Sequence, residues 1–184
     1  EFLRVLSQAM VDHRRGGSVV LVSPHDENWK DSIDFTYRFN RPEEYLFSLI
    51  AELIKWLDEW GRQQEEKRRG KDGERELMFY PESEEERKLH RALRLVGGLT
   101  AVDGAMIMTT DLKILGYGAK LKAHTEQLIV REWLPFGGYA QKPLQDIGGT
   151  RHSSAAQFVS RYPETVIFVA SQDGRFTIFW CNED

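Results

Sequence analysis

The sequence predicts a mixed α/β domain, in which a largely antiparallel central sheet is flanked by helices. Up to residue 97 helical patterns dominate, whereas from residue 98 onward glycines, β-branched residues and aromatics replace most charges. Hydrophobic residues make up 41% of the 184 positions, which is enough to build a core. We therefore expect a single domain over residues 1–184, helix-rich in its first part and sheet-rich in its second.

Before residue 40 the pattern predicts one helix and two strands. Phe2–Arg14 carries apolar residues at helical spacing and is stopped by Gly16 and Gly17. Ser18–Ser23 is a compact apolar run typical of a buried strand, and Ile33–Phe39 alternates apolar and polar residues as a half-exposed strand does.

A long helix is expected to begin near residue 40. Asn40 suits its cap and Pro42 suits its first turn. A regular apolar stripe, which indicates core packing, follows at Tyr45, Leu46, Leu49, Ile50, Leu53, Ile54, Leu57 and Trp60.

A charged stretch occupies residues 62–94, with ten basic and nine acidic side chains. This near-neutral mixture is typical of solvated helix faces, and we expect a mobile loop near residues 62–82. Ser83 and Glu86 form a capping box for a further helix, which is expected to end at Gly97-Gly98.

The second half predicts strands around tight turns, together with one helix. An Asp-Gly pair between Gln172 and Arg175 is a strong hairpin signal. The expected strands are Ala101–Thr109, Lys113–Lys120, Leu128–Trp133, Val166–Ala170 and Phe176–Trp180, and the expected helix is Thr150–Arg161.

Composition and missing motifs argue against several classes of protein. The net charge of −4 gives no general attraction to nucleic acid, so any phosphate contact must be local. Cys181, the one cysteine, allows neither an intramolecular disulfide nor a cysteine-rich zinc site, and we expect it to be an apolar filler. No run of 18 apolar residues and no signal-peptide pattern is visible, so we expect a cytoplasmic protein without a membrane partner. Walker A, nucleophile-elbow and histidine metal-site spacings are also absent.

Asp103 is unusual because it is a carboxylate within an apolar run, followed by Gly104 and Ala105. A buried carboxylate needs a metal, a base or several amides, and a glycine lets a ligand approach closely. An Asp-Gly turn or a β-bulge explains the same residues equally well, so both interpretations stay open.

A second cluster, residues 148–156, contains Thr150, Arg151 and His152 at a predicted helix start. Thr150 is suited to cap this helix, and the amides of a helix start favour an anion such as phosphate. The alternative is an ordinary capped helix with an exposed Arg151 and His152. A carboxylate able to hold Mg²⁺ or Mn²⁺ and a phosphate-binding helix start are together the minimum for nucleotide chemistry.

The two clusters resemble the motifs of a known family. Asp103-Gly104-Ala105 is similar to the DGA motif of the diadenylate cyclase (DisA N-terminal, or DAC) domain, and Gly149-Thr150-Arg151-His152 to its GTRHR motif. The resemblance covers roughly residues 95–180. It implies a nucleotide-binding domain whose active members condense two ATP molecules into cyclic di-AMP, with Mg²⁺ or Mn²⁺, at a face-to-face homodimer.

The resemblance also implies roles for individual residues. Asp103 would hold the metal and help to activate the ribose 3′-hydroxyl, and His152 would belong to the catalytic group. The residues implied to contact the nucleotide or its phosphates are Gly104, Ala105, Gly149, Thr150, Arg151, His152, Ser153 and Ser171.

Two departures from the family motif weaken catalysis more than binding. Ser153 stands where the family has a second arginine, and Gln172 where it has a glutamate, with Asp173 one residue away. Both missing groups would stabilise transition-state charge. The chain is therefore more similar to the divergent DACNV-type branch, which implies a sensor of a nucleotide or cyclic dinucleotide with a fused or associated effector. An active diadenylate cyclase and a non-binding structural module are the alternatives.

Overall fold

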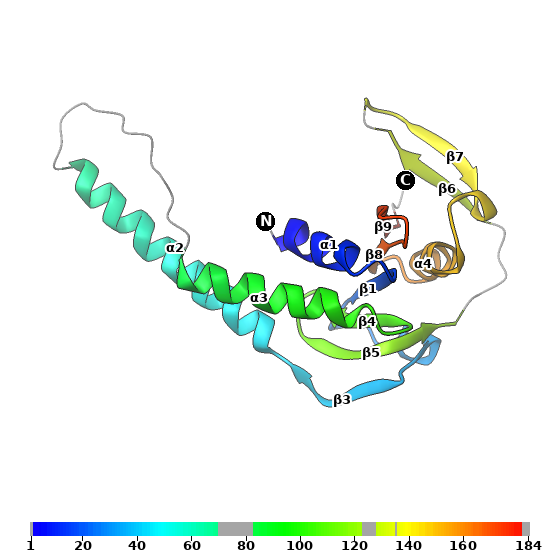
Figure 1. Cartoon of the computed structure of the whole chain (residues 1–184), viewed down its shortest axis with the longest axis horizontal. Coiled ribbons are helices and arrows are strands. Elements are labelled where there is room, and N and C mark those ends of the chain that lie inside the picture. Colours follow the sequence, from blue (N-terminus) through cyan, green and yellow to red (C-terminus); the bar gives the residue numbers. More distant parts are fainter. Residues whose placement is uncertain (1, 70–82, 123–127, 135, 182–184) are drawn as a thin grey trace.

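The computed structural model describes residues 2–69, 83–122, 128–134 and 136–181. The main sheet comprises β1 (Gly17–Val22), β2 (Ile33–Asp34), β3 (Tyr37–Glu43), β4 (Ala105–Thr109), β5 (Ile114–Leu121), β8 (Val166–Ala170) and β9 (Phe176–Trp180). Its strand order is β2-β5-β4-β1-β8-β9, and β3 also pairs with β5 (Figure 1). Among the described strands, β1 and β4 form the one parallel pair, and all other pairs are antiparallel. The predicted fold class is confirmed.

Helices cover both faces of this sheet (Figure 1). Because successive side chains of a strand point to opposite faces, each strand contributes side chains to two hydrophobic cores, one on each face of the sheet. Val19 and Met106 pack with the helices on one face, whereas Val20 and Ile107 pack with the helix on the other. The first face carries α1 (Phe2–Asp12), α2 (Tyr45–Arg69) and α3 (Glu84–Leu99), and the second carries α4 (Thr150–Arg161).

The predicted strand Ile33–Phe39 is split into β2 and β3, and β3 continues to Glu43. The prediction that Asn40 and Pro42 open a helix is therefore wrong, because both lie in a strand and α2 begins at Tyr45. Strand β3 pairs with β5 alone, and a proline without an N–H group is tolerated where a strand edge needs no hydrogen-bond donor.

The apolar stripe of α2 is only partly core. Leu46 and Leu49 are buried and Leu53 packs against the same core, whereas Tyr45 and Ile54 are more than half exposed. The side chain of Leu57 lies outside the described part of the chain. The helix continues to Arg69, so the predicted loop is wrong for residues 62–69, and its remainder, residues 70–82, lies outside the described residues.

Ser83 caps α3 as predicted, since its Oγ accepts a hydrogen bond from the Glu86 N–H at 3.0 Å. The helix does not end at Gly97-Gly98 but passes through both glycines to Leu99. A Cβ on Gly97 would lie 2.4 Å from the Cβ of Ala9 in α1. Gly97 therefore allows α1 and α3 to pack closely, instead of terminating the helix.

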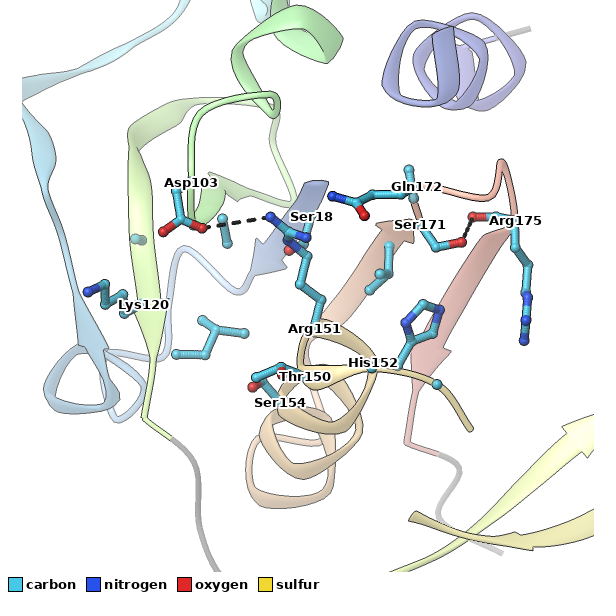
Figure 2. A pocket seen from close by; sticks show the side chains of 18 of the residues that line it. Ser18, Asp103, Lys120, Thr150, Arg151, His152, Ser154, Ser171, Gln172 and Arg175 are labelled. Atoms are coloured by element: carbon cyan, nitrogen blue, oxygen red, sulfur yellow. Dashed lines mark hydrogen bonds and ion pairs between the residues drawn. The ribbon is translucent and has the colours of Figure 1, made fainter. Parts of the chain in front are cut away.

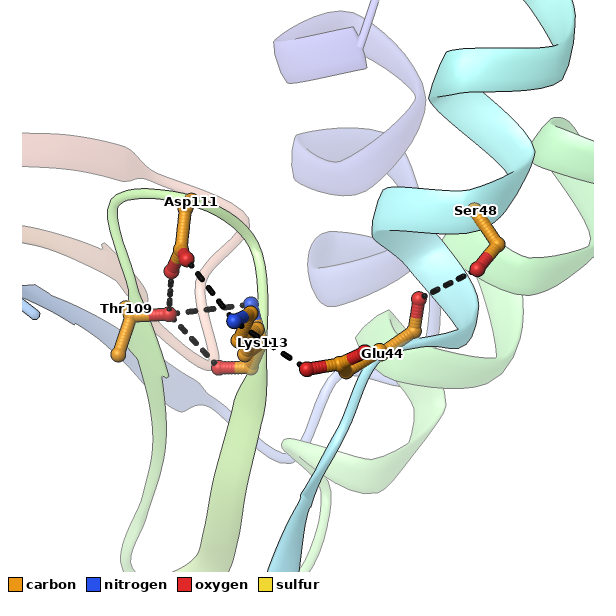
Figure 3. Close-up of polar contacts among 5 residues, drawn as sticks. All are labelled: Glu44, Ser48, Thr109, Asp111 and Lys113. Atoms are coloured by element: carbon orange, nitrogen blue, oxygen red, sulfur yellow. Dashed lines mark hydrogen bonds and ion pairs between the residues drawn. The ribbon is translucent and has the colours of Figure 1, made fainter.

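A small polar network joins the sheet to α2 (Figure 3). Lys113 Nζ lies 3.2 Å from Glu44 Oε1 and 3.4 Å from Asp111 Oδ2. The Thr109 hydroxyl donates to Asp111, and this hydrogen bond is the main cause that lowers the pKa of Asp111. The network holds the β4–β5 turn against the start of α2.

The remaining elements follow the predictions with two exceptions. The predicted strand Leu128–Trp133 exists as β6 (Ile129–Trp133), but it pairs with the unpredicted β7 (Tyr139–Pro143) in a separate two-stranded sheet. The predicted strand Ala101–Thr109 is shorter, because β4 begins only at Ala105. Helix α4 and the β8–β9 hairpin have the predicted bounds.

Candidate functional site

A pocket of about 720 Å³ opens at the end of the sheet where β1 and β4 begin and β5 and β8 end (Figure 2). The first turn of α4 and the β8–β9 turn form the rest of its wall. Both chain halves thus contribute, because the parallel pair places Ser18 at the start of β1 in register with Ala105 at the start of β4.

Asp103 lies in the turn between α3 and β4, where its side chain is 93% exposed. The interpretation of a buried carboxylate within a strand is therefore wrong, and the alternative of an Asp-Gly turn is correct. Gly104 has φ +107° and a Cβ there would lie 2.5 Å from the backbone carbon of Gly118, so glycine is required. The turn places an exposed carboxylate at the edge of the pocket.

Helix α4 begins without a side-chain cap. Gly149 is its N-cap residue and Thr150 its first helical residue, so the prediction that Thr150 caps the helix is wrong. Gly149 has no side chain, so no side-chain hydrogen bond caps the helix at this position. The free N–H groups of a first helical turn attract anions, and here that turn lines the pocket.

Arg151 extends from this helix start toward Asp103 (Figure 2). Its Nη2 lies 3.7 Å from Asp103 Oδ1, and its side chain is 36% exposed. A Cβ on Gly16 would lie 3.1 Å from Arg151 Nη1, so the backbone just before β1 lies close to the guanidinium. Arg151 thus lies between Asp103 and the segment before β1, and its side chain keeps access to solvent.

His152 is only 4% exposed and is held by two ring contacts. Its Nε2 lies 3.3 Å from the Thr177 Oγ1, and its ring meets Phe179 edge-on. Burial, followed by the nearby positive charge of Arg175, lowers the pKa of His152, while Asp173 partly offsets this effect. His152 therefore contributes a neutral hydrogen-bonding ring to the pocket at neutral pH.

The β8–β9 turn holds Asp173 in place with two hydrogen bonds. The Ser171 hydroxyl donates to Asp173, and the Arg175 N–H donates to the same carboxylate at 3.2 Å. The first of these hydrogen bonds is the main cause that lowers the pKa of Asp173. Gln172 instead donates to the Arg15 carbonyl at 3.4 Å, so both side chains are engaged in local structure.

Most of the predicted site residues meet in this pocket. Ser153 is the exception, since it does not line the pocket, whereas Ser154 does. The sequence analysis missed Ser18, Lys120 and Arg175, which no local motif marks. The predicted residues that line the pocket are Asp103, Gly104, Ala105, Gly149, Thr150, Arg151, His152 and Ser171.

The pocket is locally cationic although the chain is acidic overall. Its lining includes Lys120, Arg151 and Arg175 against Asp103 and Asp173, a balance of +1, while the whole chain carries −4. This arrangement favours an anionic ligand at one place on the surface.

The described residues contain no group of three His, Cys, Asp or Glu side chains placed to hold a metal ion. Asp103 offers a single exposed carboxylate. Mg²⁺ commonly uses one or two carboxylates together with the phosphates of a bound nucleotide, so Asp103 fits a cation that arrives with such a ligand.

No protein-family model matches the chain, and no curated protein matches it. None of the described helices combines the length and apolar character needed to cross a bilayer. The resemblance to the diadenylate cyclase domain thus depends on the two motifs alone, and function has to be argued from the pocket.

Proposed function

We propose that this chain binds a nucleotide or cyclic dinucleotide in the pocket at the start of α4, as a DAC-like sensor domain that signals to a fused or associated effector. The observation that carries the proposal is the uncapped first turn of α4, with Arg151 beside it, in a pocket of about 720 Å³. This volume lies within the range of small-molecule sites, and both features favour phosphate.

In the proposed complex, phosphate oxygens accept hydrogen bonds from the first-turn amides of α4 and from the guanidinium of Arg151. The phosphate then competes with Asp103 for Arg151, which costs little because this ion pair is long and exposed. Asp103, once released, is available to Mg²⁺ or Mn²⁺ bound to the phosphates. Neutral His152 supports the helix start from the buried side.

Catalysis by a diadenylate cyclase mechanism is the alternative, favoured by the exposure of Asp103. It requires Asp103 to accept a proton from, or to orient, an attacking ribose hydroxyl near a metal-bound phosphate. The local engagement of Asp173 and the presence of Gln172 leave no second carboxylate free at the β8–β9 turn. We therefore propose ligand binding as the function and keep catalysis as the alternative.

Titration calorimetry of the chain with ATP, cyclic di-AMP and adenosine, with and without Mn²⁺, tests the proposal. We expect the phosphate-bearing ligands to bind and adenosine to bind far more weakly. Arg151→Ala should weaken binding by roughly tenfold to a hundredfold, since hydrogen bonds to charged groups are worth about 1.5–3 kcal/mol. Arg161→Ala is the matched control, because it removes the same charge from the other end of α4.

Three results contradict the proposal. If no phosphate-bearing ligand binds, or if Arg151→Ala leaves affinity unchanged, the pocket is not a nucleotide site. If incubation with ATP and Mn²⁺ accumulates cyclic di-AMP, the sensor role is replaced by the cyclase alternative.

A further inference from the structure

A second pocket, of about 470 Å³, lies beside strand β3 and shares no lining residue with the first. Trp29, Phe35, Phe39 and Leu115 supply its apolar wall. Lys30 and Arg38 supply two positive charges, and no carboxylate is part of the lining.

The pairing of β3 with β5 explains why a pocket opens there. Arg38 pairs with Gly116 and Glu43 pairs with Ile114, so residues 39–42 of β3 oppose Leu115 alone. The extra residues bulge out of the ladder, and Leu115 lines the pocket beneath them. Bulges of this kind re-aim side chains and are frequent beside binding sites.

Arg38 has the free charge in this pocket. Its guanidinium lies 5.5 Å from the centroid of the Phe35 ring, and it forms no ion pair within the described part of the chain. Lys30, in contrast, is already paired with Glu27 at 2.5 Å. Arg38 is therefore the cation that an incoming anion would meet.

Trp29 forms the buried part of the pocket wall. It is 3% exposed, and its Nε1 is buried with no hydrogen-bond partner among the described residues. Less than 1 Å² of this atom is accessible, so a ligand in the pocket meets other atoms of the indole ring and not its N–H group.

We infer that this pocket is a binding site for a small planar carboxylate, distinct from the proposed nucleotide site. The flat body of the ligand packs against Phe35 and Phe39, and its carboxylate binds Arg38. Phe35 and Phe39 offer aromatic stacking and Arg38 offers a cation, which together favour a flat carboxylate. The inference stands whether or not the nucleotide proposal does.

Titration of the ¹⁵N-labelled chain with 1-naphthoate tests the inference, with the indole N–H signal of Trp29 as the reporter. Trp29→Phe identifies that signal by its loss. We expect the signal to move saturably with naphthoate, and the uncharged 1-naphthamide to bind at least about tenfold more weakly. Arg38→Gln should weaken naphthoate binding by at least about tenfold.

Arg41→Gln is the matched control, because Arg41 belongs to the same strand but does not line the pocket. Its affinity for naphthoate should stay within about twofold of the unaltered chain. The inference is wrong if the Trp29 signal does not move, if naphthamide binds as well as naphthoate, or if Arg38→Gln has no more effect than Arg41→Gln. It is also wrong if Arg151→Ala abolishes the response, since naphthoate would then occupy the first pocket.

Discussion

Individual residues of the first pocket differ in how firmly their surroundings hold them. Asp103 and Arg151 are exposed and 3.7 Å apart, so little free energy opposes their separation by a ligand. His152 is buried between Thr177 and Phe179, and its position does not depend on a ligand. In this pocket the charged side chains of Asp103 and Arg151 can therefore exchange each other for a ligand, whereas the ring of His152 stays in place.

The burial of His152 predicts a pH dependence of stability. Its pKa in the folded chain is below the ordinary value of 6.5, mainly because of burial. As the pH falls below about 6.5, the unfolded chain binds a proton that the folded chain does not, so stability decreases. His152→Gln removes the side chain that binds this proton. It should therefore reduce the loss of stability between about pH 7 and pH 5, measured by urea unfolding at both pH values.

The comparison is between the two losses of stability, because His152→Gln replaces this one histidine and leaves the others in place. Equal losses of stability in the parent chain and in His152→Gln would contradict the assignment of a lowered pKa to His152. His90→Gln offers a control at a histidine outside the pocket.

At the scale of elements, close packing of helices α1 and α3 depends on one of two adjacent glycines. Gly97 faces Ala9, whereas a Cβ on Gly98 would meet nothing within 4 Å. The end of α3 leads into the turn that carries Asp103, and His13 after α1 contacts Thr100 at 3.1 Å. The spacing of these two helices therefore bears on where Asp103 lies.

These glycines predict opposite effects of the same substitution. Gly97→Ala should destabilise the protein by about 1–3 kcal/mol, because its Cβ would force α1 and α3 apart. Gly98→Ala should be neutral or stabilising by up to about 1 kcal/mol, because alanine favours helix at an open position. Urea unfolding measures both, and equal effects of the two substitutions would show that helix propensity, not packing, decides.

At the scale of the whole molecule, the pocket joins segments from both halves of the chain. Ser18 in β1, Asp103 before β4 and Arg151 in α4 meet only when the β1–β4 pair and the α4 layer are both formed. A ligand in this pocket consequently binds the folded state alone, and its binding free energy adds to stability.

This coupling predicts stabilisation by ligand. ATP at about one hundred times its dissociation constant should raise the free energy of unfolding by about 2.7 kcal/mol. At the same ATP concentration, Arg151→Ala should show a much smaller increase, while Arg161→Ala should behave as the parent chain. Urea unfolding with and without ATP measures the difference, and an equal increase in Arg151→Ala would place the ligand elsewhere.

Elements with strong local signals could be predicted from the amino-acid sequence. The bounds of α4, the β8–β9 hairpin and the cap of α3 at Ser83 follow from apolar spacing, turn residues and a capping side chain, which all lie within a few residues of one another. The two motifs also marked seven residues of the pocket, because each motif contributes several neighbours at once.

Features that depend on distant partners could not be predicted, because they arise only when the chain folds. Pro42 lies in a strand because β5 is beside it, and Gly97 lies inside a helix because Ala9 packs against it. Asp103 is exposed in a turn because β4 starts two residues later, in register with β1. Lys120 and Arg175 reach the pocket through strand order, which no local pattern encodes, since pairing and packing energies depend on residues far away along the chain.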